Sequence, residues 1–222
     1  MSSWLAIQGK QQRHPLSNPT KDSTVAITVC VNFADKLLAT LELNSVMLKQ
    51  IYVVTDPSDK KTIDLCETFT NVNVILCADA HKDGAKFNKS GLIRAAQHVI
   101  TPKHRNDWIM IIDADTIIPF DFWSSTSNKE FYNDTVYLLR RKIYHSNAEY
   151  IKNKPNKITE SGCGFFQLYY DKNKMYNNYS KSAADCDILF QNLFRHQEEL
   201  PGYCMHLGQP GQDWNGRVSG TW

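Results

Sequence analysis

Apolar residues in this chain fall into two alternating kinds of stretch, short continuous runs and longer segments with helical spacing. The continuous runs are rich in β-branched residues and predict strands at residues 25–33, 51–55, 72–77 and 108–112. Segments with apolar residues three or four apart predict helices at residues 37–48, 62–69 and 89–100, the last capped by Asn88. Continuously apolar strands that alternate with helices indicate an α/β fold with a mostly parallel central sheet and helices on both faces.

The pattern changes after Pro119. Strands are predicted at residues 136–144, 164–170 and 204–207, with a helix at 183–194 and a tail at 208–222 that is rich in Gly and Pro. We therefore expect one domain over residues 24–222, with a regular half at 24–118 and a mixed half at 119–222. Residues 1–23 lack a regular period, and we expect them to form a poorly ordered or loosely docked arm.

The composition is that of an ordinary globular protein, with 42% hydrophobic and 22% charged residues among 222. A net charge of +2 gives no reason to expect nucleic-acid binding, and we interpret the basic cluster at 139–142 as a solvated strand end. The chain contains no apolar stretch of membrane-spanning length and no apolar core of a signal peptide. Six cysteines without C-x-x-C spacing lie mostly in apolar runs, which favours reduced core thiols in a cytoplasmic setting over a disulfide framework.

Polar side chains follow several of the predicted strands directly. Asp113 and Asp115 come after the strand 108–112, Asn32 lies at the end of the first strand, and Asp56 follows the second. Ligands of open parallel sheets bind beyond the carboxyl ends of the strands, so these side chains are candidates for one binding site.

Two aspartates separated by one residue can both reach a hard divalent cation. If the chain brings His206 to the same place, its imidazole moves the preference towards Mn²⁺, with Mg²⁺ as the alternative. A D-x-D sequence alone is weak evidence, because aspartates are common in exposed turns. Its position directly after a buried strand is what makes a metal site the better interpretation.

The order of motifs resembles nucleotide-sugar glycosyltransferases of the Rossmann-like GT-A fold, most closely the inverting family-2-like enzymes, which include small viral and bacterial members. The resemblance covers residues 24–217, and its most specific parts are Asp-Ala-Asp after a buried strand and the late His-Leu-Gly. The segments that carry it are FNKSGLIRAA (87–96), WIMIIDADTIIP (108–119), SGCGFFQLYY (161–170), ADCDILF (184–190) and HLGQPGQDWNGR (206–217). It implies a nucleotide-binding half at 24–118 and an acceptor-binding half at 119–222, in the cytoplasm or in the host cytoplasm for a viral protein.

The resemblance also implies roles for individual residues. Asn32, Phe33 and Asp56 would hold the base and ribose, and Lys89 would face the diphosphate. The sequence departs from the family pattern at Val53-Val54-Thr55-Asp56, where two successive acidic residues are usual, and at Ala184-Asp185, where Glu-Asp is usual. The other implied residues are Asp113 near the ribose and metal, Asp115 and His206 as metal ligands, Gly162 to Phe166 (with Gly164 and Phe165) on the acceptor and donor-sugar floor, and Trp214 to Arg217 as a loop over the phosphates.

Transfer to a hydroxyl acceptor also needs a general base. On a helix, Ile188 and Leu189 follow Asp185 by three and four positions, which places Asp185 on the apolar face. Asp187 shares a face with Gln191 and is expected to be solvated. We therefore predict Asp185 as the general base of an inverting transfer, with a helix-capping role for Asp185 as the alternative.

The predicted function is thus metal-dependent transfer of a sugar, most readily from a UDP-sugar, to a glycan or another hydroxyl acceptor. Two other classes stay open. A sugar-nucleotide nucleotidyltransferase would need a Gly-rich phosphate loop after the first strand, where this chain has Asn32-Phe33-Ala34-Asp35. A non-catalytic nucleotide- or sugar-binding module could keep the same fold.

Overall fold

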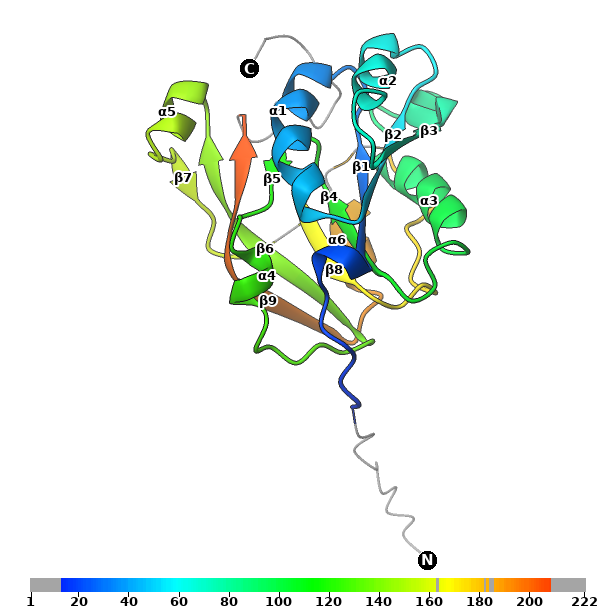
Figure 1. The fold of residues 1–222 in the computed structure, drawn as a ribbon. Helices are drawn as coiled ribbons and strands as arrows, with labels where there is room; N and C mark the ends of the chain where they lie inside the picture. The colour runs from blue at the N-terminus through cyan, green and yellow to red at the C-terminus, as the bar shows by residue number, and fades with distance from the viewer. Residues whose placement is uncertain (1–12, 163, 182, 184–185, 209–222) are drawn as a thin grey trace, which may run out of the picture.

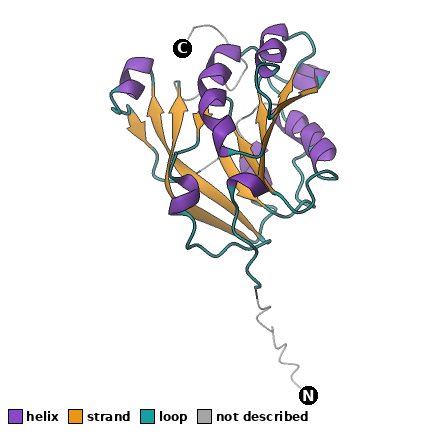
Figure 2. Cartoon of the chain, viewed as in Figure 1, coloured by secondary structure: helices purple, strands orange, loops and turns teal. Residues whose placement is uncertain are grey.

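The structure, a computed structural model, describes residues 13–162, 164–181, 183 and 186–208. Strands form one central sheet and helices lie around it (Figure 1, Figure 2). The first part of the chain alternates as predicted. Its elements are the short 3-10 helix Lys21–Ser23, β1 (Thr24–Val29), α1 (Ala34–Asn44), the 3-10 turn Ser45–Met47, β2 (Gln50–Thr55), α2 (Lys60–Cys66), β3 (Val72–Leu76), the 3-10 segment Ala78–Gly84, α3 (Lys89–Ile100) and β4 (Trp108–Ile112).

The second part is built mainly of strands. Its elements are β5 (Thr116–Ile117), α4 (Phe122–Ser125), β6 (Thr135–Tyr144), α5 (Asn147–Ile151), β7 (Lys157–Ile158), β8 (Phe166–Tyr169), α6 (Cys186–Gln191) and β9 (His196–Leu207). The nine strands form one sheet in the order β3-β2-β1-β4-β8-β6-β9-β5, and β7 pairs with β6. The four strands β1 to β4 are parallel, whereas β8 is antiparallel to both β4 and β6. The predicted α/β fold, a mostly parallel front half with a mixed back half, is confirmed.

Helices cover both faces of the sheet with separate apolar cores. One core joins the strands to Leu37 and Leu41 of α1, Cys66 of α2 and Phe122 of α4. The other joins them to α3 and α6, through residues such as Leu92, Ile93, Ala96, Cys186 and Phe190. Continuous apolar strands are therefore required, because both faces of β1 and β4 are buried.

The start of α3 shows how a local signal in the sequence fixes a helix. The side chain of Asn88 accepts a hydrogen bond from the Gly91 backbone N–H (3.1 Å), which satisfies one of the free donors at the helix N-terminus. The same oxygen accepts from the Ser180 N–H (2.8 Å), so the cap also ties α3 to the back half. Such a cap contributes about 1 kcal/mol to stability.

Two expectations about the extent of elements in the back half are wrong, and so is one about burial. The final strand begins at His196 rather than Cys204, because its first residues pair with β6 while alternating polar side chains face outwards. The helix expected at 183–194 is described only from Cys186 and ends at Gln191. The basic cluster is not a solvated strand end, since Arg140, Arg141 and Lys142 are half-buried within β6, with Arg140 lying over the Tyr203 ring and Arg141 over the Phe165 ring.

The described part of the N-terminal arm contacts the domain. The Leu16 backbone bridges to Phe131, and the Trp108 indole donates to the Ser17 carbonyl (3.2 Å). The five described cysteines, Cys30, Cys66, Cys77, Cys186 and Cys204, are free thiols, and burial raises the pKa of Cys30 to about 12. Within the described residues, no helix has the length and apolar character needed to span a bilayer.

Candidate active site

The loop after β4 is the point where the two halves of the chain meet. The Asp113 backbone N–H donates to the Phe165 carbonyl (3.1 Å), and the Leu207 N–H donates to the Asp115 carbonyl (2.7 Å). The carbonyl of Ala114 accepts from the Thr40 hydroxyl of α1 (2.8 Å). The Asp-Ala-Asp sequence is therefore held from three directions, by α1, by the segment before β8 and by the end of β9.

A buried lysine joins this loop to α6. The ammonium group of Lys89 lies 2.8 Å from Asp113 Oδ1 and 2.8 Å from Asp187 Oδ2. The Lys89 side chain is 8% exposed and that of Asp187 is 11% exposed, whereas Asp113 is 31% exposed. Lys89 is in the first turn of α3, so the Asn88 cap that begins this helix also positions the lysine.

The charges of this cluster strongly influence one another. Burial acts to lower the pKa of Lys89, but the two carboxylates outweigh it and hold this pKa well above its usual value. Burial raises the pKa of Asp187 above its usual value, and the nearby Lys89 opposes that rise. The protein therefore keeps a desolvated carboxylate and a desolvated ammonium in contact, at the edge of the sheet where ligands bind in this fold class.

Asp187 is oriented by neutral groups as well. Its Oδ1 accepts from the Tyr176 hydroxyl (2.7 Å) and from the Gln167 side-chain amide (3.1 Å). Gly164 packs directly against it, and a Cβ at that position would lie only 2.2 Å from the Asp187 Cβ. Only glycine fits there, and its absent side chain leaves room for the carboxylate.

The candidate metal ligands are brought together only in part. His206 Nε2 lies 3.3 Å from Asp115 Oδ2, and both side chains are nearly buried. The other ring nitrogen of His206, Nδ1, is buried without a hydrogen-bond partner. In the described part of the chain, no three His, Cys, Asp or Glu side chains gather in a geometry that could hold a metal ion, and Asp113 instead pairs with Lys89. The oxygen and nitrogen of the Asp115–His206 pair nevertheless suit a divalent transition metal.

The predicted base-binding residues occupy different environments. Asp56 sits in a turn, where hydrogen bonds from the Ser58 hydroxyl and N–H lower its pKa. Asn32 has a positive φ of 63°, and its N–H donates to Asp59 Oδ2 (2.6 Å). Asp59, which was not predicted as a site residue, is buried, caps α2 and ties the segments that follow β1 and β2 together. An N-cap signal, Asp three residues before Thr62, was present in the sequence.

The prediction that Ile188 and Leu189 lie on the inward face of α6 is wrong. Ile188 and Leu189, which were expected to face inwards, are 54% and 53% exposed, whereas Asp187 and Gln191 are buried. The inward face of α6 is therefore the one that carries Asp187. Asp185, Trp214 and Arg217 lie outside the described residues.

Neither a protein-family model nor a curated protein sequence matches the chain. Solved structures share its fold at low identity. A 4-diphosphocytidyl-2C-methyl-D-erythritol synthase has a TM-score of 0.50 and 13% identity, covering 86% of this chain and 95% of its own. The mannosyl-3-phosphoglycerate synthase of Rubrobacter xylanophilus also has a TM-score of 0.50, with 14% identity over 86% of this chain and 68% of its own.

A further similar structure is the glucosyl-3-phosphoglycerate synthase of Mycobacterium tuberculosis, solved with Mn²⁺, UDP and phosphoglyceric acid. It has a TM-score of 0.48 and 10% identity, covering 85% of this chain and 72% of its own. The two likenesses at a TM-score of 0.50 establish the fold, a Rossmann-like α/β domain that this chain shares with these two synthases. At such low identity they establish the fold alone.

Proposed function

We propose that this protein transfers a sugar from a nucleotide-sugar donor, with UDP-sugars as the first candidates, to a hydroxyl group of a glycan or another acceptor. The observation that carries the proposal is the buried carboxylate of Asp187, set across Lys89 from the D-x-D aspartate Asp113. A purely structural ion pair would not need to lie at the ligand-binding edge of the sheet. Keeping two charges desolvated there costs folding free energy that an apolar pair would not.

The charged residues around the loop that follows β4 each have a chemical task in the proposed reaction. Asp115 and His206 would hold the divalent ion, Mn²⁺ in preference to Mg²⁺, with Asp113 beside them. When bound, such an ion supplies Lewis-acid stabilisation of the departing diphosphate. Lys89 adds a fixed positive charge at the same edge, although its contacts with Asp113 and Asp187 make it a bridge between carboxylates rather than a dedicated phosphate ligand.

We assign the general base to Asp187, in place of the Asp185 favoured by the sequence. Asp187 would take the proton of the acceptor hydroxyl as that oxygen bonds to the anomeric carbon. The bond from the anomeric carbon to the donor phosphate breaks in the same step, and its electron pair leaves with the nucleoside diphosphate. A burial-raised pKa suits this role, because it makes the carboxylate a stronger proton acceptor. A single displacement of this kind inverts the anomeric configuration.

The second candidate function is nucleotidyl transfer. Lys36 favours it, because this largely buried lysine lies in the first turn of α1, directly after the loop that follows β1. Its ammonium is 5.4 Å from the Phe33 ring and packs close to Gly208. A nucleotidyltransferase would need a phosphate-binding segment directly after the first strand, and Lys36 supplies a cation there, without the Gly-rich loop.

A donor panel tests the proposal. The protein is incubated with UDP-, GDP- and TDP-sugars and Mn²⁺, with and without acceptor alcohols, and the released nucleotide is identified. We expect a nucleoside diphosphate whose release stops in EDTA. Pyrophosphate-dependent formation of a nucleoside triphosphate would instead establish the second candidate, and binding of nucleotide without turnover would indicate a non-catalytic module.

Matched variants identify the base. Asp187→Asn should keep nucleotide binding and lower turnover by about two to four orders of magnitude, the usual range for losing a general base. Asp185→Asn and the exposed helix variant Asp64→Asn should stay close to wild type. Equal turnover of Asp187→Asn and wild type would refute the assignment, and a retained anomeric configuration in the product, measured by NMR, would refute the single displacement.

A further inference from the structure

Two cations of β6 share one aromatic ring. The guanidinium of Arg140 lies 4.6 Å from the centre of the Tyr203 ring, and the ammonium of Lys142 lies 5.6 Å from the same centre. Arg140 and Tyr203 are direct partners in the β6–β9 pairing. Because alternate residues of a strand point to the same face, Arg140 and Lys142 project together from one side of the sheet. Tyr203 thus holds two like charges close to each other.

This pair of cations has little compensating negative charge. Glu199 Oε2 is 3.9 Å from Arg140 Nε, too far for a hydrogen bond, and that nitrogen is buried without a hydrogen-bond partner. The other oxygen of Glu199 is occupied by the Gly162 N–H (2.8 Å). Within the described residues, Lys142 has no ion pair with a carboxylate.

The surrounding hairpin adds to the positive charge. β7 pairs with the end of β6, so that Lys157 lies opposite Ile143, on the other face of the sheet from Lys142. Residues 140–160 contain more basic than acidic side chains, Arg140, Arg141, Lys142, Lys152, Lys154 and Lys157 against Glu149 and Glu160. The carboxylate of Glu149 also accepts a hydrogen bond from the His145 N–H (2.7 Å), which reduces its value as a counter-charge. An anion near Arg140 and Lys142 is therefore electrostatically favoured.

A short segment connects these cations to the proposed base. Gly162 packs on β6, where an added Cβ would lie 2.7 Å from the Leu138 Cβ, on the same face as Arg140. Gly164 packs on Asp187. The two glycines are two residues apart, so their Cα atoms lie at most about 7 Å from each other. Leu138 is paired with Gln167, whose side chain donates to Asp187, and Arg140 follows Leu138 by two residues on the same face, about 7 Å along the strand. The cations therefore lie along the sheet face that carries Asp187.

We propose that the acceptor carries an anionic group, a phosphate or a carboxylate, which Arg140 and Lys142 bind while Asp187 activates its hydroxyl. This inference rests on the proposed sugar transfer. Arg140 supplies a planar fork that can bind two oxygens of one anion, and Lys142 supplies a point charge that adapts to either group. Tyr203 keeps the guanidinium in place through its ring face. Gly162 and Gly164 would lie beneath the sugar, between the anion and the reacting hydroxyl.

A binding experiment with inorganic phosphate tests the anion site directly. The wild-type protein is first saturated with UDP and Mg²⁺, which fills the proposed donor site, and amide NMR shifts are followed during a phosphate titration. We expect saturable shifts at Tyr203 and Gly162. Arg140→Gln/Lys142→Gln should weaken them about tenfold or more, the effect of losing charge-assisted hydrogen bonds. The exposed pair Lys61→Gln/Lys103→Gln serves as the control and should bind as wild type.

Two results would overturn the proposal. The first is a wild-type protein whose Tyr203 and Gly162 amides do not shift with phosphate, or a double variant whose shifts equal those of the wild type. Either outcome would show that Arg140 and Lys142 do not bind the anion. Tight binding of a DNA oligonucleotide that is lost equally on replacing Lys152, Lys154 and Lys157 would make the hairpin a polyanion surface instead.

Acceptor competition separates the two anion sources and isolates the underlying function. Glucose, glucose 6-phosphate and glucuronate are compared as inhibitors of phosphate binding, and preference for one anionic sugar identifies the group. Donor hydrolysis without acceptor should be equal in wild type and the Arg140→Gln/Lys142→Gln variant. If no nucleotide is released by either protein, the proposed sugar transfer fails while the phosphate titration still decides the anion site.

Discussion

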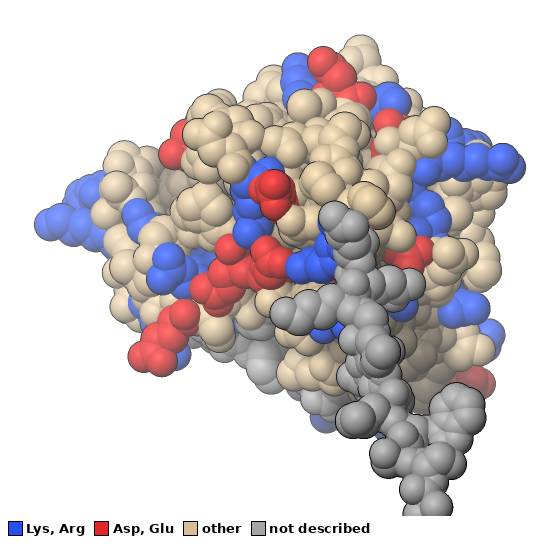
Figure 3. Space-filling model, turned by 90° about the horizontal axis from the view of Figure 1, so that it is seen from below, with Lys and Arg blue, Asp and Glu red and all other residues tan. Residues whose placement is uncertain are grey.

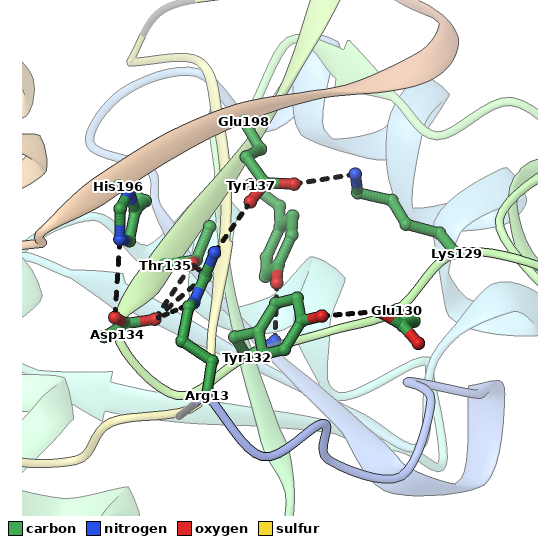
Figure 4. Close-up of polar contacts among 9 residues, drawn as sticks. All are labelled: Arg13, Lys129, Glu130, Tyr132, Asp134, Thr135, Tyr137, His196 and Glu198. Atoms are coloured by element: carbon green, nitrogen blue, oxygen red, sulfur yellow. Dashed lines mark hydrogen bonds and ion pairs between the residues drawn. The ribbon is translucent and has the colours of Figure 1, made fainter. Parts of the chain in front are cut away.

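The protein contains two clusters of charged side chains that differ in burial and therefore in what they cost. The first is the Lys89 cluster, in which the ammonium contacts Asp113 and Asp187 and is 8% exposed. The second is the Arg13 cluster at the opposite end of the sheet, where Arg13 and Glu198 are each 30% exposed (Figure 4). One pair of charges lies in the interior at the ligand-binding edge, whereas the other stays in contact with water.

The Arg13 cluster attaches the N-terminal arm. Arg13 donates to Asp134 Oδ1 (2.9 Å) and to the Thr135 hydroxyl, lies 3.7 Å from Glu198, and stacks 3.8 Å above the Tyr132 ring. Lys129 bonds Glu198 from the other side (2.8 Å). Viewed from below, this end of the molecule carries acidic and basic side chains next to one another (Figure 3). Charges arranged in this way cost little desolvation and contribute little each.

The difference indicates what each cluster is for. Burying a charge costs several kcal/mol, and good hydrogen bonds in a buried pair only approximately offset that cost. The Lys89 cluster carries this desolvation cost at the carboxyl ends of the parallel strands, where ligands of such sheets bind, and this favours a role in chemistry. The Arg13 cluster joins segments that are distant in sequence, without a buried charge, which favours a role in holding the arm.

The largest effect is expected from removing the central cation. Lys89→Met leaves the carboxylates of Asp113 and Asp187 facing each other without compensation, and should lower the free energy of unfolding by about 3 kcal/mol. The double variant Lys89→Met/Asp187→Asn removes the buried charge as well and should recover most of that loss. Urea unfolding measures both. If the single and double variants are equally unstable, the cost is lost packing rather than an unpaired charge, and the contrast between the clusters is smaller than proposed.

Metal affinity tests the chemical role of the loop that carries Asp113 and Asp115, independently of stability. His206→Ala removes a nitrogen ligand beside Asp115, and Mn²⁺ affinity in the presence of UDP should fall by about 10- to 100-fold, or about 1.4 to 2.7 kcal/mol. His98→Ala, on the exposed face of α3, is the matched control. Calorimetric titration measures both. Unchanged affinity in His206→Ala would make this histidine a structural partner of Asp115.

These two clusters also mark what the sequence could predict. The strand 108–112, its following Asp113 and Asp115, and the Asn88 cap depend on neighbours within a few residues, and the structure confirms all of these positions. The metal-binding and nucleotide-binding roles of the predicted residues stay predictions. The ends of strands were predicted less well where polar residues alternate with apolar ones, as at the start of β9.

The environment of Asp187 could not be predicted because it depends on long-range packing. The periodicity of Ile188 and Leu189 indicated one face of α6, but Tyr176 and Gln167 hold the opposite face inwards. The burial of Asp59 has the same kind of origin, since the Asn32 N–H reaches it from the loop after β1. Polar side chains buried by distant partners leave no period in the sequence.

An intermediate case tests whether burial sets the cost. Lys49 is 41% exposed and bonds the buried Asp107 (2.8 Å), which His104 also contacts. Burial tends to raise the pKa of Asp107, but Lys49 and His104 outweigh it and lower that pKa. The carboxylate therefore contributes stability above pH 4, which is lost as the pH falls through its folded pKa.

Removal of Lys49 should accordingly matter only when Asp107 is ionised. We expect Lys49→Met to lower the free energy of unfolding by about 1 kcal/mol at pH 7 and by much less at about pH 2. The exposed lysine variant Lys60→Met is the control, and urea unfolding at both pH values is the measurement. An equal loss at both pH values would show that Lys49 acts through its apolar stem.

The smallest effect is expected at Arg13. Arg13→Ala should lower the free energy of unfolding by about 0.5 to 1 kcal/mol, the range of partly exposed ion pairs, and the difference should shrink in 1 M salt, which screens such pairs. Arg13→Lys keeps the charge but loses the planar guanidinium and its flat stacking on Tyr132. Its free energy of unfolding should therefore lie between those of the wild type and Arg13→Ala. Proteolysis at residues 14–20 of the arm should accelerate in Arg13→Ala while donor turnover stays at the wild-type value, with the exposed Lys21→Ala as control. If Arg13→Ala loses as much stability as Lys89→Met, contact with solvent does not lower the cost of breaking a charged cluster in this protein. The assignment of a chemical role to the Lys89 cluster and a structural role to the Arg13 cluster would then lose its physical basis.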